Sequence, residues 1–158
     1  MRFGWIIGSY FLVSGGFILA FLASQLVPIP KDLGLIPFYS LCGIGALFGG
    51  MVAARASEGD TIIQPAIGAL LFVGSLVAAF TLTTMGTIIS QFAGMTFGND
   101  LTQFLAITGG CFVGGALVGA FLGEKVGGDS EPGGMFRASQ AFFSIAGGMF
   151  VGLFAVAM

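Results

Sequence analysis

The chain has 158 residues, of which 56% are hydrophobic and 8% are charged, and its net charge is −2. Since a soluble domain carries about 25% charged residues, this composition excludes a water-soluble globular protein and indicates an integral membrane protein. The few basic residues form no patch for nucleic acid, so we expect no nucleic-acid partner. Histidine is absent, which removes the commonest general base and transition-metal ligand. We therefore expect no enzymatic activity, no catalytic residues, no metal and no cofactor.

Five apolar stretches, none with a charge in its middle, fill most of the chain. A bilayer core about 30 Å thick needs about 20 apolar residues per helix, and each stretch satisfies this length. The sequence therefore predicts an all-α polytopic membrane protein, with five transmembrane helices in one bundle and a single transmembrane domain over residues 1–158. The expected helices cover residues 3–27, 37–55, 61–84, 101–123 and 136–158.

Prolines and polar residues separate these stretches. Pro28 ends the first, and Pro37 is well placed to start the second. Pro65 lies close enough to the start of the third to be tolerated. Apolar residues of segment 85–99 recur at helical spacing, which favours an amphipathic helix at the membrane interface. A re-entrant segment and a continuation of the third helix are the alternatives.

Basic residues decide the orientation of a membrane protein, because cytoplasmic loops carry an excess of Lys and Arg. With five spans, only Lys31 falls on the side opposite the N-terminus. The basic residues on the N-terminal side are Arg2, Arg55, Lys125 and Arg137. We expect a protein of the plasma or inner membrane with a cytoplasmic N-terminus and the C-terminus on the opposite side.

Small residues four positions apart mark one face of several expected helices. Such a face lets a neighbouring helix approach closely, and dispersion contacts then hold the two helices together. The expected packing positions are Gly45, Gly49, Gly50, Gly110, Gly114, Gly115, Gly119, Gly148 and Gly152. For any single motif we favour packing within one chain, but the faces outnumber what one bundle needs. We therefore predict a membrane subunit that contacts the lipid bilayer and joins a homo-oligomer or other membrane subunits.

The second and fourth stretches share a pattern at an offset of 69 residues, seen in Cys42 and Cys111 and in the small residues after them. This indicates a duplicated helical hairpin, in which the second and third helices correspond to the fourth and fifth. Chance alignment of two glycine-rich helices is the alternative.

Polar side chains within the spans are few, and every charged residue falls near a helix end or in a loop. This distribution disfavours a proton-coupled transporter, because such proteins carry ionisable groups inside the membrane. The remaining candidates for interhelical contacts or a polar pathway are Tyr10, Gln64, Thr108, Gln140 and Ser144. The alternative function is a passive channel or facilitator for a small solute, with a pathway lined by glycine, hydroxyls and phenylalanine.

Overall fold

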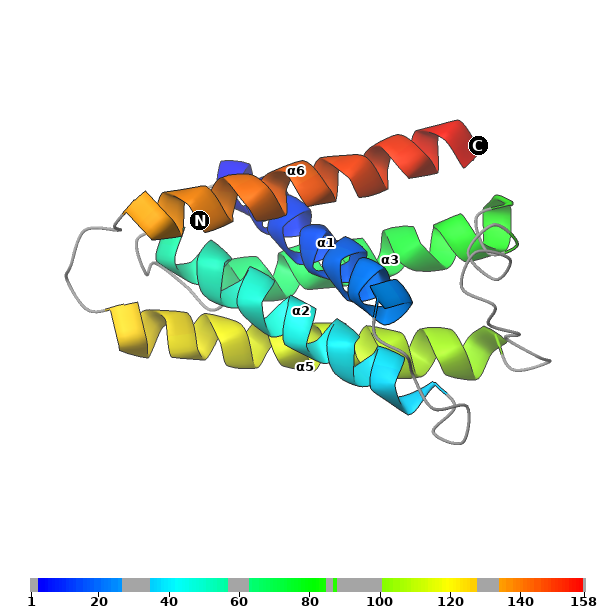
Figure 1. The fold of residues 1–158 in the computed structure, drawn as a ribbon, viewed down its shortest axis with the longest axis horizontal. Helices are drawn as coiled ribbons and strands as arrows, with labels where there is room; N and C mark the ends of the chain where they lie inside the picture. The colour runs from blue at the N-terminus through cyan, green and yellow to red at the C-terminus, as the bar shows by residue number, and fades with distance from the viewer. Residues whose placement is uncertain are drawn as a thin grey trace.

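The computed structural model describes residues 3–26, 35–56, 63–84, 87, 101–127 and 134–157. Over these residues the chain is all-helical and contains no strand. The helices are α1 (Phe3–Leu26), α2 (Ile36–Ala56), α3 (Ile63–Leu82), α5 (Leu101–Gly127) and α6 (Gly134–Ala157) (Figure 1). The five-helix bundle expected from the sequence is confirmed.

Four of these helices, α1, α2, α3 and α5, are long and apolar enough to cross a membrane. The fifth helix, α6, has 24 residues, and a helix of this length extends about 36 Å, enough to span a bilayer. Its first turns carry Arg137, Ser139 and Gln140, which lower its mean hydropathy. The chain is thus a membrane protein built from helices of nearly uniform length.

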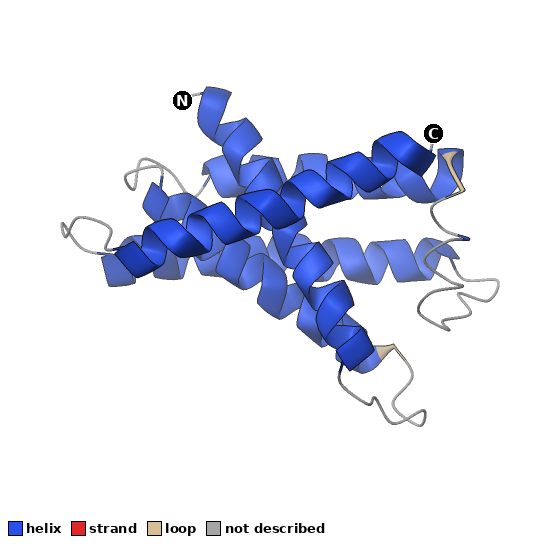
Figure 2. Cartoon of the chain, turned by 45° about the horizontal axis from the view of Figure 1, so that its top comes forward, coloured by secondary structure: helices blue, strands red, loops and turns tan. Residues whose placement is uncertain are grey.

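The helices run in two directions. As the colours of Figure 1 show, α2 and α5 run one way, side by side and parallel, whereas α1, α3 and α6 run the opposite way. The first helix, α1, crosses the bundle obliquely (Figure 2) and contacts α2, α3 and α6. The crossing helix α1 therefore joins α2, α3 and α6, whereas α5 joins the bundle mainly through α2 and α3.

Helix boundaries agree with the sequence to within two residues at all but one end. The exception is α5, which was expected to end at Gly123 and continues to Gly127. The extra turn places the Lys125 ammonium 4.9 Å from the centre of the Phe121 ring, and a cation near a helix C-terminus also stabilises the helix dipole. The expected interfacial segment, 85–99, lies outside the described residues except for Thr87.

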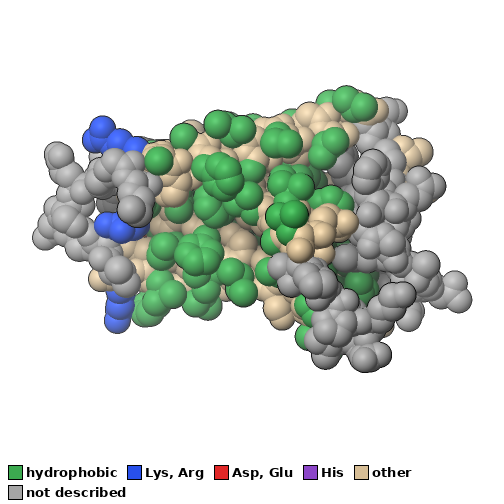
Figure 3. Space-filling model, viewed as in Figure 1, with side chains coloured by type: hydrophobic (Ala, Val, Ile, Leu, Met, Phe, Trp, Pro, Cys, Tyr) green, Lys and Arg blue, Asp and Glu red, His purple; other side chains and the backbone are tan. Residues whose placement is uncertain are grey.

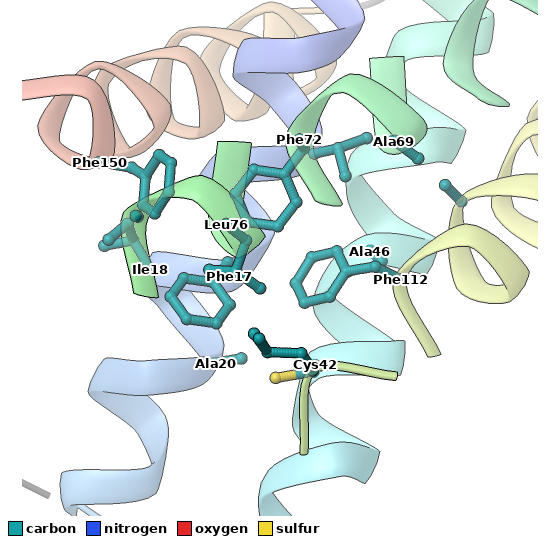
Figure 4. Packing of buried hydrophobic residues seen from close by; sticks show 14 of the residues in the cluster. Phe17, Ile18, Ala20, Cys42, Ala46, Ala69, Phe72, Leu76, Phe112 and Phe150 are labelled. Atoms are coloured by element: carbon teal, nitrogen blue, oxygen red, sulfur yellow. The ribbon is translucent and has the colours of Figure 1, made fainter. Parts of the chain in front are cut away.

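Phenylalanine fills the centre of the bundle. Phe72 lies 4.9 Å from Phe112 and 5.0 Å from Phe150, measured between ring centres, and Phe17 reaches all three rings (Figure 4). These rings come from α1, α3, α5 and α6, and each is almost completely buried. Aromatic pairs at these distances add stabilisation beyond the area that they bury, so this cluster holds four helices together.

Candidate helix-assembly site

The closest contact between α1 and α2 is made by two glycines. A β-carbon placed at Gly45 would overlap the carbonyl oxygen of Gly16, and one placed at Gly16 would overlap that of Gly45. One turn along α2, a β-carbon at Gly49 would lie 2.7 Å from the carbonyl oxygen of Leu12 and 3.1 Å from the Cα of Val13. Glycine at both positions of α2 therefore lets the backbone of α1 touch that of α2.

Glycines also bring the parallel pair α2 and α5 together. A β-carbon at Gly119 would overlap the carbonyl of Leu47, and one at Gly50 would overlap that of Ala116. A β-carbon at Gly115 would overlap the carbonyl oxygen of Gly43 and lie 3.1 Å from the Cβ of Ala46. The same contact recurs two turns further along α5, where a β-carbon at Gly123 would lie 3.2 Å from the Cβ of Ala54.

Three further glycines at helix crossings were not singled out by sequence reasoning. A β-carbon at Gly15 would overlap the Phe143 carbonyl, one at Gly147 would overlap that of Phe11, and one at Gly68 would lie 2.7 Å from the Cβ of Ser9. Gly15 and Gly147 each belong to a pair of adjacent glycines. Such pairs are a sequence signal, because adjacent residues of an α-helix point about 100° apart, so two neighbouring glycines can each face a different helix.

Four of the expected packing positions turn away from the bundle. Gly110 and Gly114 on α5, and Gly148 and Gly152 on α6, are exposed. No described atom of a neighbouring helix lies within 4 Å of a β-carbon placed at any of them. The nine expected positions thus divide into five that face a neighbouring backbone of the same chain and four that face outward.

The five polar residues that the sequence suggested for a pathway do not line one common path through the bundle. Tyr10 on α1 donates a hydrogen bond to the Ser75 hydroxyl of α3 at 3.1 Å. Gln64 and Thr108 are buried, Gln140 is half-buried, and Ser144 is exposed on the outer surface of α6. Of the five candidates, Tyr10 therefore forms an interhelical hydrogen bond, and Ser144 faces away from the bundle.

Polar side chains that are buried or half-buried fall into two groups. The hydroxyls of Ser14 and Ser75 donate to a backbone carbonyl three residues earlier, at 3.0 and 2.7 Å, as hydroxyls in membrane helices commonly do. The side-chain oxygens of Ser9, Gln64 and Thr108 have no hydrogen-bond partner within the described part of the chain. The sequence does not distinguish Ser9, whose hydroxyl lacks a partner within the described part of the chain, from Ser14, whose hydroxyl donates to Phe11, because any serine within a helix can bond back to its own backbone.

Charged side chains of the described helices gather at one end of the bundle, where α2 and α5 end and α6 begins (Figure 3). The Arg55 guanidinium lies 5.1 Å from the centre of the Phe136 ring and thereby links the last turn of α2 to the first turn of α6. The rest of the described surface carries no charged side chain and exposes many large apolar ones, which suits contact with lipid or with another helix.

No protein family matches this chain, and searches of curated proteins and of solved structures also found no match.

Proposed function

We propose that this protein is a non-enzymatic subunit of a membrane assembly, held to copies of itself or to other subunits by the outward glycine faces of α5 and α6. The observation that carries the proposal is the open space around Gly110, Gly114, Gly148 and Gly152. A glycine in a helix costs about 1 kcal/mol relative to alanine. Inside this bundle, glycine offsets that cost by allowing backbones to touch, and a neighbouring chain would offset it in the same way on the outside.

The surface chemistry of α6 supports a second helix as its neighbour. Gly148 and Gly152 lie on one face with Ser144, because all three are spaced four residues apart and all are exposed. In lipid the hydrophobic effect does not drive association, so small residues that allow close van der Waals packing become the main determinant. Gly110 and Gly114 repeat this spacing on α5.

The aromatic core favours assembly over passive conduction. A path through one chain would have to pass Phe17, Phe38, Phe72, Phe112 and Phe150, all nearly inaccessible and in ring contact with one another. A channel function would therefore need a path between chains. In liposomes containing the purified protein, we expect no saturable or selective solute flux.

The assembly test is a mass measurement in mild detergent. The chain has a mass of 16.1 kDa, and we expect the wild-type protein to be recovered as a multiple of this mass or together with another membrane subunit. The double variant Gly114→Leu with Gly148→Leu should release the chain as a monomer. The matched control is Gly4→Leu, because Gly4 also has open space around it but lies off both faces. A wild-type chain that is monomeric and alone after cross-linking in its native membrane would contradict the proposal.

A further inference from the structure

The contacts between α2 and α5 follow a two-fold pseudo-symmetry. Adding 69 to Leu47 and Gly50 gives Ala116 and Gly119. Exchanging each residue for its equivalent in the other helix therefore turns the contact of Gly119 with Leu47 into the contact of Gly50 with Ala116. The structure contains both contacts. This reciprocity is the property of an isologous two-fold interface.

Contacts on the axis itself have the same property. Ala46 pairs with Gly115, and Ala54 pairs with Gly123, at 3.1 and 3.2 Å between Cβ positions. Each of these pairs is separated by 69 residues, so each maps onto itself. Because α2 and α5 run in the same direction (Figure 1), the axis lies along the helices.

One repeat has a covering helix. The face of α2 that α1 covers includes Phe38, whose ring lies 6.2 Å from that of Phe17, and both Gly45 and Gly49. Val52 and Ala53 continue this face and pack with Leu12. All five positions of α2 thus contact α1, which runs antiparallel to α2.

Among the described helices, none covers the corresponding face of α5. An offset of 69 carries the α1-binding face of α2 onto Ile107, Gly114, Val118, Phe121 and Leu122. The large side chains among them are 37% (Ile107), 52% (Val118), 46% (Phe121) and 37% (Leu122) exposed, and a β-carbon at Gly114 would meet no described atom within 4 Å. Within the part of the chain that the structure describes, no helix therefore takes the position on α5 that α1 takes on α2.

We infer that this face of α5 binds one transmembrane helix of a different membrane subunit, which crosses α5 near Gly114 as α1 crosses α2 at Gly45. The inference rests on the proposed function and specifies its partner. Because a two-fold axis along the helices preserves direction, the partner helix runs antiparallel to α5. It carries glycine or alanine at the crossing, as α1 carries Gly16, with larger apolar residues on either side.

Differences between the repeats shift the crossing point. Val118 replaces Gly49, which closes one end of the glycine face, whereas Gly110 replaces Leu41, which opens the other end. The partner helix therefore approaches α5 most closely between Gly110 and Gly114, about one turn nearer to the start of α5 than strict symmetry predicts.

The test uses a synthetic transmembrane peptide with the sequence of residues 3–26 as the probe. The full-length protein is reconstituted in liposomes with a photoreactive phenylalanine at Ile107 or at Leu122, the two ends of the face. We expect the C-terminal half of the peptide to cross-link at Ile107 and its N-terminal half at Leu122. A peptide with Gly16→Leu should cross-link about tenfold less, because overpacking at a tight crossing costs on the order of 1.4 kcal/mol.

Other outcomes overturn the inference. Cross-links to lipid alone would show a lipid-facing surface, and cross-links to a second copy of the full-length chain would show a homo-oligomer contact. Cross-links with the reverse polarity would contradict the symmetry.

Single variants separate this inference from the proposed function. Binding of the peptide should be lost in Gly114→Leu and retained in Gly148→Leu. If the native assembly dissociates in Gly148→Leu but persists in Gly114→Leu, the proposed assembly function is supported and the partner site on α5 is contradicted.

Discussion

Gly16 of α1 and Gly45 of α2 cross so closely that each occupies the space that a β-carbon on the other would need. The obstructing atoms are backbone carbonyls, which cannot move aside as a flexible side chain can. We predict that Gly45→Ala lowers the free energy of unfolding by about 1–3 kcal/mol, the usual cost of overpacking.

Thermal unfolding in detergent measures this effect. The control is Gly4→Ala, since Gly4 has open space at its Cβ position, and it should leave the midpoint unchanged or slightly raised. Equal midpoints for the two variants would mean that α1 and α2 do not meet at these glycines.

The aromatic core predicts a large effect from one truncation. Phe72 is fully buried and contacts the rings of Phe17, Phe112 and Phe150. Phe72→Ala should lower the free energy of unfolding by about 3–5 kcal/mol through lost contacts and the remaining cavity. Phe142→Ala is the control, because Phe142 is 57% exposed and a surface change costs about 0.5 kcal/mol or less. Denaturant titration in detergent should separate the two variants clearly.

Thr108 offers a test with the opposite sign. Its side chain is fully buried, and its hydroxyl has no partner among the described residues. Because an unpaired buried polar group is unfavourable, Thr108→Val should raise the free energy of unfolding by about 1 kcal/mol. Thr81→Val is the control, since the exposed Thr81 hydroxyl donates to the Val77 carbonyl at 2.8 Å. A lower midpoint for Thr108→Val would reveal a hydrogen bond to water or to a partner.

The hydrogen bond from Tyr10 to Ser75 joins α1 to α3. Interhelical hydrogen bonds in membrane proteins contribute about 0.6 kcal/mol on average, so Tyr10→Phe should cost about this amount. A double-mutant cycle with Ser75→Ala isolates the pair. Additive effects of the two substitutions would show that the two hydroxyls do not interact.

Sequence reasoning predicted the helices well because long apolar stretches and prolines are local signals. A spacing of four residues is also a local signal, and it indicates which small residues share one face of a helix. Sequence reasoning could not divide those faces into inner and outer ones. Gly45 and Gly114 are separated by the 69-residue offset at which the two stretches share a pattern, yet a β-carbon at Gly45 would meet Gly16, whereas one at Gly114 would meet no described atom within 4 Å. The difference depends on where α1 lies, and the local sequence of α2 or α5 holds no information about that.

The same limit applies to the polar residues and to one helix end. Ser9 and Ser14 look alike in the sequence, but Ser14 bonds back to Phe11 and Ser9 lies against Gly68 of another helix. The end of α5 was placed at Gly123 because Glu124 and Lys125 are polar. The structure continues the helix to Gly127, where the Lys125 ammonium lies 4.9 Å from the centre of the Phe121 ring, an attraction between a cation and an aromatic face that local polarity does not predict.

The parallel pairing of α2 and α5 predicts a specific cross-link. Ala54 and Gly123 place their Cβ positions 3.2 Å apart, slightly closer than the 3.5–4.5 Å of a disulfide. A β-carbon at Gly123 would also lie 2.7 Å from the carbonyl oxygen of Met51, so a small separation of α2 and α5 relieves this overlap and brings the two Cβ atoms to the disulfide distance. Both native cysteines are free, so we propose to replace Cys42 and Cys111 with alanine. In that background, Ala54→Cys with Gly123→Cys should form a disulfide within one chain when a copper(II) complex oxidises the two thiols.

Mobility on a non-reducing gel and intact mass report this bond. The matched control pairs Ala54→Cys with Gly114→Cys, which faces outward from α5 and should remain reduced. A cross-link found only between chains, or in the control to the same extent, would rule out the α2–α5 contact. Without this contact, α2 and α5 are not related by a two-fold axis, and Gly45 and Gly114 are not equivalent. The inference that α5 binds a partner helix near Gly114 would then be wrong.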